Sequence, residues 1–326
     1  MTQSLVFHAL QTCSVADALA LTPSLRETAK QENAVHLAAF EIQGPAILLG
    51  RWQHASRVLE ADHCASRAIA IHRRETAGTA GYVGPEGAVL FSLALPTMTS
   101  LVADTLSDTV INRNIRGFLQ GFTRAGALAH YFGREWLALS KQPGALVGVE
   151  QAEDASVSVE ILVGAQQSIE LPHEACSTVE LGISRYRGKS PVSWARAAPN
   201  APPLSQRVSL IATTVAHRAE RALHHATSAL SPQQSHPVAL DVTLDHHVAC
   251  AIGHVDLGHF SSGELWIGGD VMLSSRARSR LLRALKQTPA QRESAIVSAL
   301  ADEVSLGTNV QTWLQCGALA PQRVRL

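Results

Sequence analysis

The chain of 326 residues has no long apolar run, and none approaches the roughly 18 residues that a membrane-spanning helix requires. Its N-terminus also lacks the basic start, apolar stretch and small-residue cleavage site of a secretory signal. The formal net charge is zero, so no general attraction to nucleic acid or to an anionic membrane is expected. We therefore expect a soluble cytoplasmic protein that binds neither nucleic acid nor membrane.

Cysteine and lysine are both scarce. The five cysteines form no CxxC pair, which favours a reducing compartment and no disulfide framework. The only lysines are Lys30, Lys141, Lys189 and Lys286, and all other basic residues are arginines. Any reaction that depends on an ammonium group has few candidates in this chain.

Apolar residues make up 46% of the chain and charged residues 17%, as in ordinary globular proteins. Short apolar runs and helical spacings alternate along it. The predicted strands are 45–52, 67–74, 87–96, 134–140, 144–151 and 156–165, and the predicted helices are 55–67, 107–128 and 205–229. Because several predicted strands are hairpin-like neighbours, the pattern predicts an α+β fold with a mixed β-sheet flanked by helices.

Residues 230–237 (LSPQQSHP) are polar, contain proline at both ends and have no apolar periodicity, so they are the best candidate for a linker. This divides the chain into a large domain, 1–229, and a small α+β accessory domain, 238–326. For the small domain we expect two or three strands with a turn at 261–263, followed by helices at 276–287 and 290–304.

The stretch 72–96 (HRRETAGTAGYVGPEGAVLFSLALP) combines an arginine pair, Arg73 and Arg74, with a loop of small residues. Small residues let backbone N–H groups approach a ligand, and guanidinium groups bind phosphate or carboxylate oxygens. Taken alone, the stretch is a weak signal: it is either an anion-binding loop or an arginine pair at a strand end beside an ordinary turn, and the second is the more usual case.

The segment RRETAGTAGYV resembles the R-R-x-S-G-G-G-A-V-Y-H segment of lipoate–protein ligases, a branch of the biotin/lipoate ligase family. Upstream, ILLGRWQHASRVLEADHCASRAIAI is similar to the family's glycine-arginine-x-glutamine stretch. Downstream, GREWLALSKQPGALVG, LSQRVSL and GELWIGGDVMLSSRARSRLLRALKQ resemble later segments of the family in the same order. The resemblance spans nearly the whole chain.

This resemblance implies a ligase-like catalytic domain followed by a small accessory domain. It implies activation of lipoate or octanoate with ATP and Mg²⁺ to an acyl-adenylate, and transfer of the acyl group to a lysine of a lipoyl-domain carrier protein. Some relatives instead transfer octanoyl groups through a cysteine. The residues that would bind substrate and nucleotide, by their match to the family motifs, are Arg73, Arg74, Thr76, Gly78, Gly81 and Gly148.

The family's K-I-x-G segment matches Ala145 to Gly148, which places an alanine where the family has its lysine. Alanine cannot neutralise the charge that grows on carboxylate and phosphate oxygens during activation. Lys141 is either a catalytic substitute for that lysine or a solvated turn residue. In the loop, Ala77 and Thr79 replace two of the family's three glycines, and their side chains crowd the approach to a phosphate.

Three functions therefore stay open: an ATP-dependent ligase that uses Lys141, a non-adenylating binding protein that keeps the fold, and a fold re-used for another acid or amine. Cys176, with His173 close by, is either a nucleophile or a buried thiol. Histidines and a cysteine within 246–259 either bind zinc or are exposed strand residues, and we assign no metal site. The basic stretch 184–203 either meets phosphates or an acidic carrier domain, or is a solvated loop.

Overall fold

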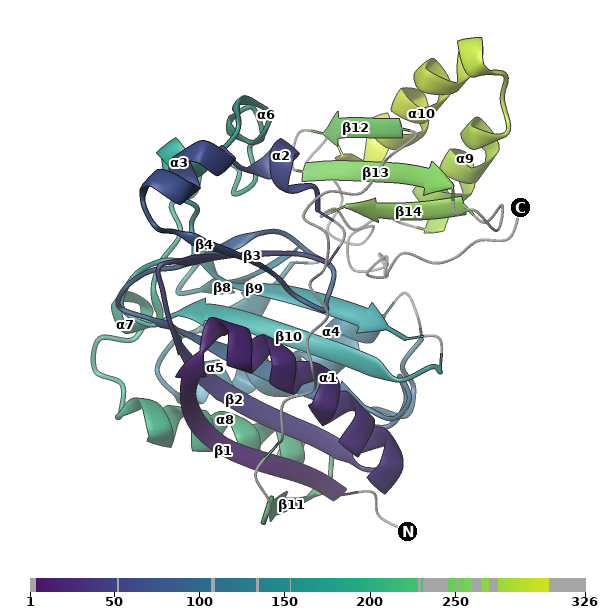
Figure 1. The fold of residues 1–326 in the computed structure, drawn as a ribbon. Coiled ribbons are helices and arrows are strands. Elements are labelled where there is room, and N and C mark those ends of the chain that lie inside the picture. Colours follow the sequence, from purple (N-terminus) through teal and green to yellow (C-terminus); the bar gives the residue numbers. More distant parts are fainter. Residues whose placement is uncertain are drawn as a thin grey trace.

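The computed structural model describes residues 4–51, 53–106, 109–132, 135–152, 154–227, 230, 246–250, 253–259, 265–269 and 275–304. Its central element is an eight-stranded sheet with the strand order β11-β1-β2-β6-β10-β9-β8-β7 (Figure 1). The strands are β1 (Ser4–Ser14), β2 (Val35–Gln43), β6 (Ala88–Leu95), β7 (Ala129–Tyr131), β8 (Trp136–Leu139), β9 (Gln142–Gln151), β10 (Val157–Gly164) and β11 (Ala222–His225). Strand β1 runs parallel to β2 and β11, and the other pairs are antiparallel. The predicted mixed sheet of an α+β fold is confirmed.

One face of this sheet is covered by three helices, α4 (Val110–Asn114), α5 (Arg116–Arg124) and α8 (Leu204–Arg218). Phe118 and Phe122 of α5 lie on the same side of the helix and make edge contacts with Phe91 of β6. Trp194, in the short helix α7 (Trp194–Ala197), is fully buried beside Phe122. These aromatic side chains form the centre of the main apolar core.

The opposite face is covered by α1 (Val15–Glu32) and by a three-stranded sheet in the order β4-β3-β5. Ser14 caps the start of α1 by accepting a hydrogen bond from the Asp17 amide, and the helix ends at Asn33 in the left-handed conformation. Strands β3 (Ala46–Leu49) and β4 (Ala70–Arg73) are parallel, with helices α2 (Ala55–Val58) and α3 (Ala61–Ser66) between them. Strand β5 (Gly81–Val83) follows, so the loop 74–80 lies over the large sheet.

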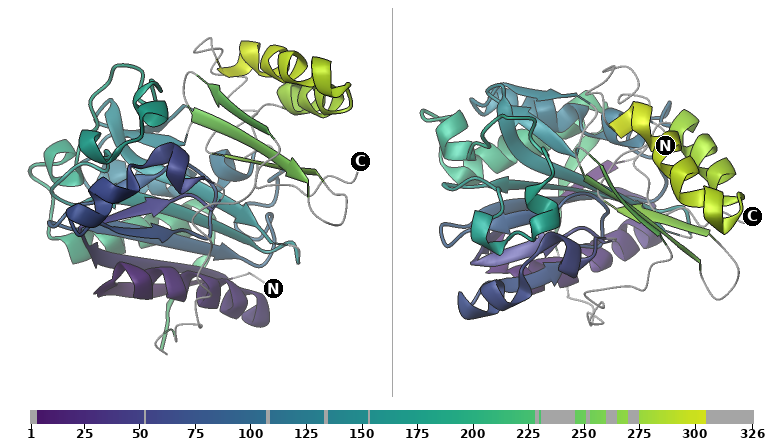
Figure 2. Two further views of the ribbon diagram at one scale, coloured as in Figure 1. Left: turned by 45° about the horizontal axis from the view of Figure 1, so that its top comes forward. Right: turned by 90° about the horizontal axis from the view of Figure 1, so that it is seen from above.

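After the large sheet come a short 3₁₀ helix, His173–Ala175, and α6 (Thr178–Leu181). The C-terminal part contains an antiparallel sheet, β12 (His246–Cys250), β13 (Gly253–His259) and β14 (Leu265–Gly269), then α9 (Ser275–Leu285) and α10 (Pro289–Val304). The yellow-green helices lie together on one side of this sheet (Figure 2). The expected strands and two helices are present here. The linker and the turn at 261–263 lie outside the described residues, apart from Leu230, and the boundaries at 229 and 238 stay predictions.

Three predicted helices differ from the structure. The helix predicted over 205–229 ends at Arg218, and Glu220 with φ 55° reverses the chain so that β11 can pair with β1. The helix predicted over 107–128 is divided at Ile115 into α4 and α5, and that over 55–67 is divided into α2 and α3. None of the described helices is both long and apolar enough to span a bilayer.

Candidate functional site

The two arginines of the loop are bound to the chain's own groups. Arg73, at the end of β4, donates through Nη1 to the carbonyl oxygens of Gly50, Arg51 and Gln53 at 2.8, 3.0 and 2.6 Å. Its guanidinium group therefore holds the turn that follows β3. Arg74 is 1% exposed and donates through Nη2 to the carbonyl oxygen of Thr79 at 2.7 Å.

A buried carboxylate lies beneath this loop. Glu160, in the middle of β10, is 0% exposed and accepts a hydrogen bond from the hydroxyl of Thr76. Burial lowers the pKa of Arg74, and the charge of Glu160 raises it. The loop thus binds a glutamate of the protein itself through Thr76, while Arg74 binds the backbone of Thr79.

Close backbone approaches explain the glycines of this region. Gly78 has φ 121°, and a Cβ there would approach the carbonyl oxygen of Val147 at 3.0 Å. A Cβ on Gly148 would meet Thr76 Oγ1 and the carbonyl oxygen of Ala77. A Cβ on Gly81 would meet Leu146 Cδ1 at 2.6 Å and Leu162 Cδ2 at 2.9 Å. The loop and β5 therefore pack directly onto β9 and β10.

Lys141 does not lie near the loop. It is exposed in the turn between β8 and β9, where Ser140 and Lys141 both have positive φ, 49° and 72°. Gly148, which contacts the loop, is seven residues further along β9, roughly 23 Å away at about 3.3 Å per residue. This distance exceeds the reach of a lysine side chain, so the structure does not bring Lys141 together with the other predicted site residues.

Ala145 points away from the loop. It is fully buried in the apolar core that includes Leu139 and Ile161 and the helices on the far face of the sheet. Gly148 lies three residues away and faces the loop, because successive residues of a strand point to opposite faces. The position that sequence matching gives to the family lysine thus faces the helical layer.

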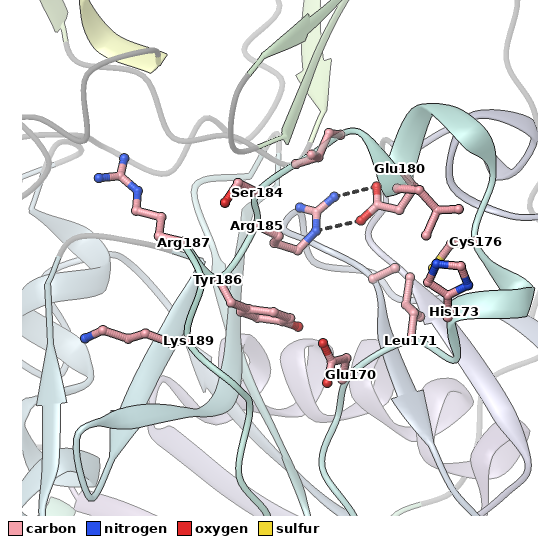
Figure 3. Close-up of a pocket in the computed structure, with 14 residues that line it drawn as sticks. Glu170, Leu171, His173, Cys176, Glu180, Ser184, Arg185, Tyr186, Arg187 and Lys189 are labelled. Carbon is pink, nitrogen blue, oxygen red and sulfur yellow. Dashed lines mark hydrogen bonds and ion pairs between the residues drawn. The ribbon is translucent and has the colours of Figure 1, made fainter.

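A cavity of about 510 Å³ adjoins the loop at Ala80 and is otherwise enclosed by the chain between Glu170 and Lys189 (Figure 3). Its lining residues are Ala80, Glu170, Leu171, His173, Cys176, Glu180, Leu181, Ile183, Ser184, Arg185, Tyr186, Arg187, Gly188 and Lys189. This volume is typical of a site for a small molecule. The basic stretch noted in the sequence therefore contributes its first residues to a cavity wall.

Within the cavity wall, Arg185 forms a bidentate ion pair with Glu180, through Nε at 2.8 Å and Nη2 at 2.7 Å (Figure 3). Both side chains are buried, so the pair fixes α6 against the segment that carries Tyr186. Burial raises the pKa of Glu170 and of Tyr186. The side chain of Lys189 is exposed at the rim.

The environment of Cys176 does not favour a nucleophilic thiolate. Burial, followed by the charge of Glu180, raises its pKa to about 12. Its Sγ lies 3.4 Å from the carbonyl oxygen of Pro172, to which the thiol donates. A thiol with such a pKa is protonated at neutral pH, and only the thiolate is nucleophilic. The interpretation of Cys176 as a buried thiol is the one that agrees with the structure.

Several guanidinium groups around the loop and the cavity form ion pairs with glutamates of the chain. Arg51 Nη1 lies 3.0 Å from Glu150 Oε1. For Arg187, burial lowers the pKa and the charge of Glu135 raises it. The ion pairs are Arg26–Glu75, Arg51–Glu150 and Arg185–Glu180. Much of the positive charge around the loop and the cavity is therefore balanced within the chain.

The glutamates that bind groups of the loop and the cavity wall were not identified from the sequence. The available signal was Glu160, a single acidic residue inside the apolar run SVSVEILVGA. Such a residue is normally paired when it is buried. In the described part of the chain, no group of three or more His, Cys, Asp or Glu side chains is arranged to hold a metal ion. The histidines of 246–259 lie in β12 and β13, whose side chains are outside the described set.

No protein-family model and no curated protein sequence matches the chain. Solved structures do match. Lipoate-bound LipL1 of P. falciparum has a TM-score of 0.60 at 11% identity, over 95% of this chain and 97% of its own. The bipartite lipoate–protein ligase of Thermoplasma acidophilum, described with its E2 lipoyl domain, has a TM-score of 0.56 at 10% identity, over 70% and 88%. ATP-bound lipoate–protein ligase A has a TM-score of 0.52 at 11% identity, over 70% of this chain and 90% of its own.

The chain therefore has the fold of lipoate–protein ligases, as the resemblance of its sequence segments predicted. Among these proteins it is most extensively matched along its length by LipL1, through both the large sheet and the C-terminal part. At identities of 10–11% the likeness concerns the fold and carries no residue roles.

Proposed function

We propose that this protein binds a small carboxylic acid in the cavity between Glu170 and Lys189 and does not activate that acid with ATP. The engagement of guanidinium groups by the chain's own carboxylates and carbonyl oxygens is the observation that carries this proposal. Formation of an acyl-adenylate needs donors directed at oxygens on which negative charge develops. Donors that are already bound to carboxylates and carbonyls of the chain do not supply that stabilisation.

The loop also leaves little room for a nucleotide. Thr76 and Ala77 are buried against β9, and the amide of Ala77 donates to the carbonyl oxygen of Val149 at 3.1 Å. Backbone N–H groups that cradle a phosphate must instead point at the ligand. The described residues thus do not fit an ATP–Mg²⁺ complex at this loop.

The cavity offers a better place for an acid. Leu171 and Ile183 give part of its wall an apolar character, and Lys189 supplies an ammonium group at the rim. An apolar wall with an ammonium group at its entrance suits an acid with a hydrocarbon chain, such as octanoate or lipoate. In this proposal the carboxylate meets Lys189 and the chain lies along the apolar wall.

A second candidate is ATP-dependent attachment of lipoate or octanoate to a lipoyl-domain carrier. The likeness to ATP-bound and lipoate-bound ligases favours it, because most proteins with this arrangement of motifs would use the fold for that reaction. Under this alternative the loop would have to leave β9 before ATP binds. The two candidates differ in whether pyrophosphate is released.

The test measures pyrophosphate release with ATP, Mg²⁺ and octanoate or lipoate, and separately titrates the same acids by calorimetry. We expect binding without pyrophosphate release. Replacing Lys189 by alanine should weaken binding roughly tenfold, since a charge-assisted contact contributes about 1.5 kcal/mol. Lys141→Gly is the matched control and should bind like the native chain.

Pyrophosphate release by the native chain would contradict the proposal and favour the ligase. Release that is abolished by Lys141→Gly would in addition restore the catalytic role first considered for that residue. Equal affinities for the native chain and Lys189→Ala would place the acid elsewhere.

A further inference from the structure

A separate cavity, of about 470 Å³, lies between α1 and the edge of the large sheet. Helix α1 contributes Glu27, Gln31 and Glu32 to its wall, and strands β1 and β2 contribute His8 and His36. It shares none of its described lining residues with the cavity between residues 170 and 189. Its volume is typical of a site for a small molecule.

Three side chains in contact with one another form part of this wall. His8 Nε2 lies 3.0 Å from His36 Nδ1, and His36 Nε2 lies 3.1 Å from Glu32 Oε2. The His36 ring is 1% exposed, whereas His8 and Glu32 are accessible from solvent. Burial lowers the pKa of both histidines, so both rings are neutral at physiological pH.

The protons of these two rings are used within the chain. A neutral imidazole has one donor and one acceptor nitrogen, and the bond between His8 and His36 uses one of each. The carboxylate of Glu32 favours a proton on the facing Nε2 of His36. His8 therefore donates through Nε2, and its Nδ1 is left as an acceptor to which no described residue donates.

Donors on the helix wall are also bound within the chain. Gln31 Nε2 donates to Glu27 Oε1 at 2.9 Å, and Thr28 Oγ1 donates to the carbonyl oxygen of Ser24 at 2.9 Å. None of the described residues that line this cavity is a lysine or an arginine. The cavity therefore presents carboxylate and imidazole acceptors without a cation of its own.

The C-terminal end of α1 adds to this preference for positive charge. Carbonyl groups at the end of a helix carry partial negative charge, which favours cations. Gln31 and Glu32, the last two residues of α1, line the cavity at this end. Lys30 of the same turn is paired with Asp154 at 2.8 Å and is not among the lining residues.

We propose that this cavity binds a small primary alkylammonium compound. Its ammonium group donates to Nδ1 of His8, and the carboxylates of Glu27 and Glu32 supply the negative charge of the site. An ammonium group suits such a wall because it has three donors and no acceptor. The alkyl chain lies along Val6 and Leu230, the apolar part of the lining. This inference is independent of the proposed function.

The test titrates the full chain at pH 7.5 with butylammonium chloride and follows the imidazole resonances of His8 and His36 by NMR. Sodium butyrate and 1-butanol are the matched probes, used at the same ionic strength and with EDTA present to remove metal ions. We expect a saturable shift of both resonances with butylammonium and none with the other two probes.

Two variants locate the ammonium group. His8→Phe keeps a ring of similar shape but removes the acceptor, and should weaken butylammonium binding roughly tenfold, as followed at His36. Glu32→Gln should weaken it roughly threefold, because the charge of an exposed carboxylate is screened by solvent. Glu86→Gln, at an exposed position in the turn between β5 and β6, is the matched control and should bind like the native chain.

Equal responses to butylammonium and 1-butanol would show a cavity without preference for charge and would overturn the inference. Unsaturable or absent shifts would overturn it as well, as would unchanged affinity in both His8→Phe and Glu32→Gln. If a variant does not fold, the comparison of the three probes on the native chain still decides. The proposed function fails on other measurements, octanoate binding and pyrophosphate release, whatever the response to butylammonium.

Discussion

At the scale of single residues, the face of the sheet to which a side chain points matters as much as the identity of the residue. Ala145 occupies the sequence position of a family lysine, yet its side chain faces the helical layer, where a lysine would be buried among apolar side chains. An ammonium group in that place would lose its charge or destabilise the fold. Gly148, three residues later, faces the loop and leaves space for Thr76. The absence of a cation at 145 is therefore consistent with packing as well as with a loss of chemistry.

Replacing Gly148 by alanine should detach the loop from β9, because the added Cβ would meet Thr76 Oγ1 and the carbonyl oxygen of Ala77. We expect the free energy of unfolding to fall by about 1–3 kcal/mol, measured by urea denaturation. The control is Gly182→Ala, at a position with φ −72° whose nearest atom would lie at an ordinary 3.4 Å. This variant should change stability by less than about 0.5 kcal/mol, and an equal loss in both variants would contradict the tight packing at Gly148.

At the scale of elements, α1 and the β1–β2 pair form a second cavity, of about 470 Å³, at the edge of the sheet. His8 Nε2 and His36 Nδ1 are 3.0 Å apart, and His36 Nε2 lies 3.1 Å from Glu32 Oε2. Burial, followed by the charge of His36, lowers the pKa of His8 to about 4, and burial also lowers the pKa of His36. Both rings are therefore neutral at physiological pH.

This pair predicts a loss of stability in acid. His8 has a lower pKa in the folded chain, about 4, than in the unfolded chain, about 6.5, so the unfolded chain binds protons first as the pH falls. The contribution of His8 to the free energy of unfolding is constant above about pH 6.5 and should be lost between pH 6.5 and 4. The loss should be about 1–2 kcal/mol once partial exposure of the ring is allowed for. Urea denaturation at pH 7.5 and pH 5 measures this difference in the free energy of unfolding. His8→Gln should reduce the dependence, whereas His130→Gln, at an exposed position on β7, should retain it.

At the scale of the whole molecule, the N-terminal strand organises the edge of the large sheet. β1 lies between β2 and β11 and is parallel to both, so residues 4–7 pair with a segment more than 200 positions later in the chain. Without β11 the backbone of β1 would present an open edge. The predicted domain boundary at 229 preserves this pair, and the likeness to LipL1 extends beyond it into the C-terminal part.

Shortening the chain tests this organisation. A chain that ends at residue 229 should keep all eight strands of the large sheet and unfold in a single cooperative transition. A chain that ends at residue 219 loses β11, and we expect a lower melting temperature and faster aggregation, because an open strand edge pairs with other chains. Calorimetry measures the melting temperature of each shortened chain, and light scattering measures its aggregation. Similar behaviour of the two shortened chains would show that β11 contributes little.

Much of this protein follows from its sequence: the apolar runs of β3, β6, β9 and β10, the mixed sheet, the helical covering and the likeness to lipoate–protein ligases. The strands and helices follow from local periodicity, which records which face of a segment is buried, whereas the likeness follows from the resemblance of motif segments. Tertiary structure alone decided that residues 222–225 pair with β1, that Lys141 lies far from the loop, and that Thr76 binds Glu160. Such outcomes depend on which distant strands become neighbours, and a single sequence does not encode that in the spacing of its apolar residues.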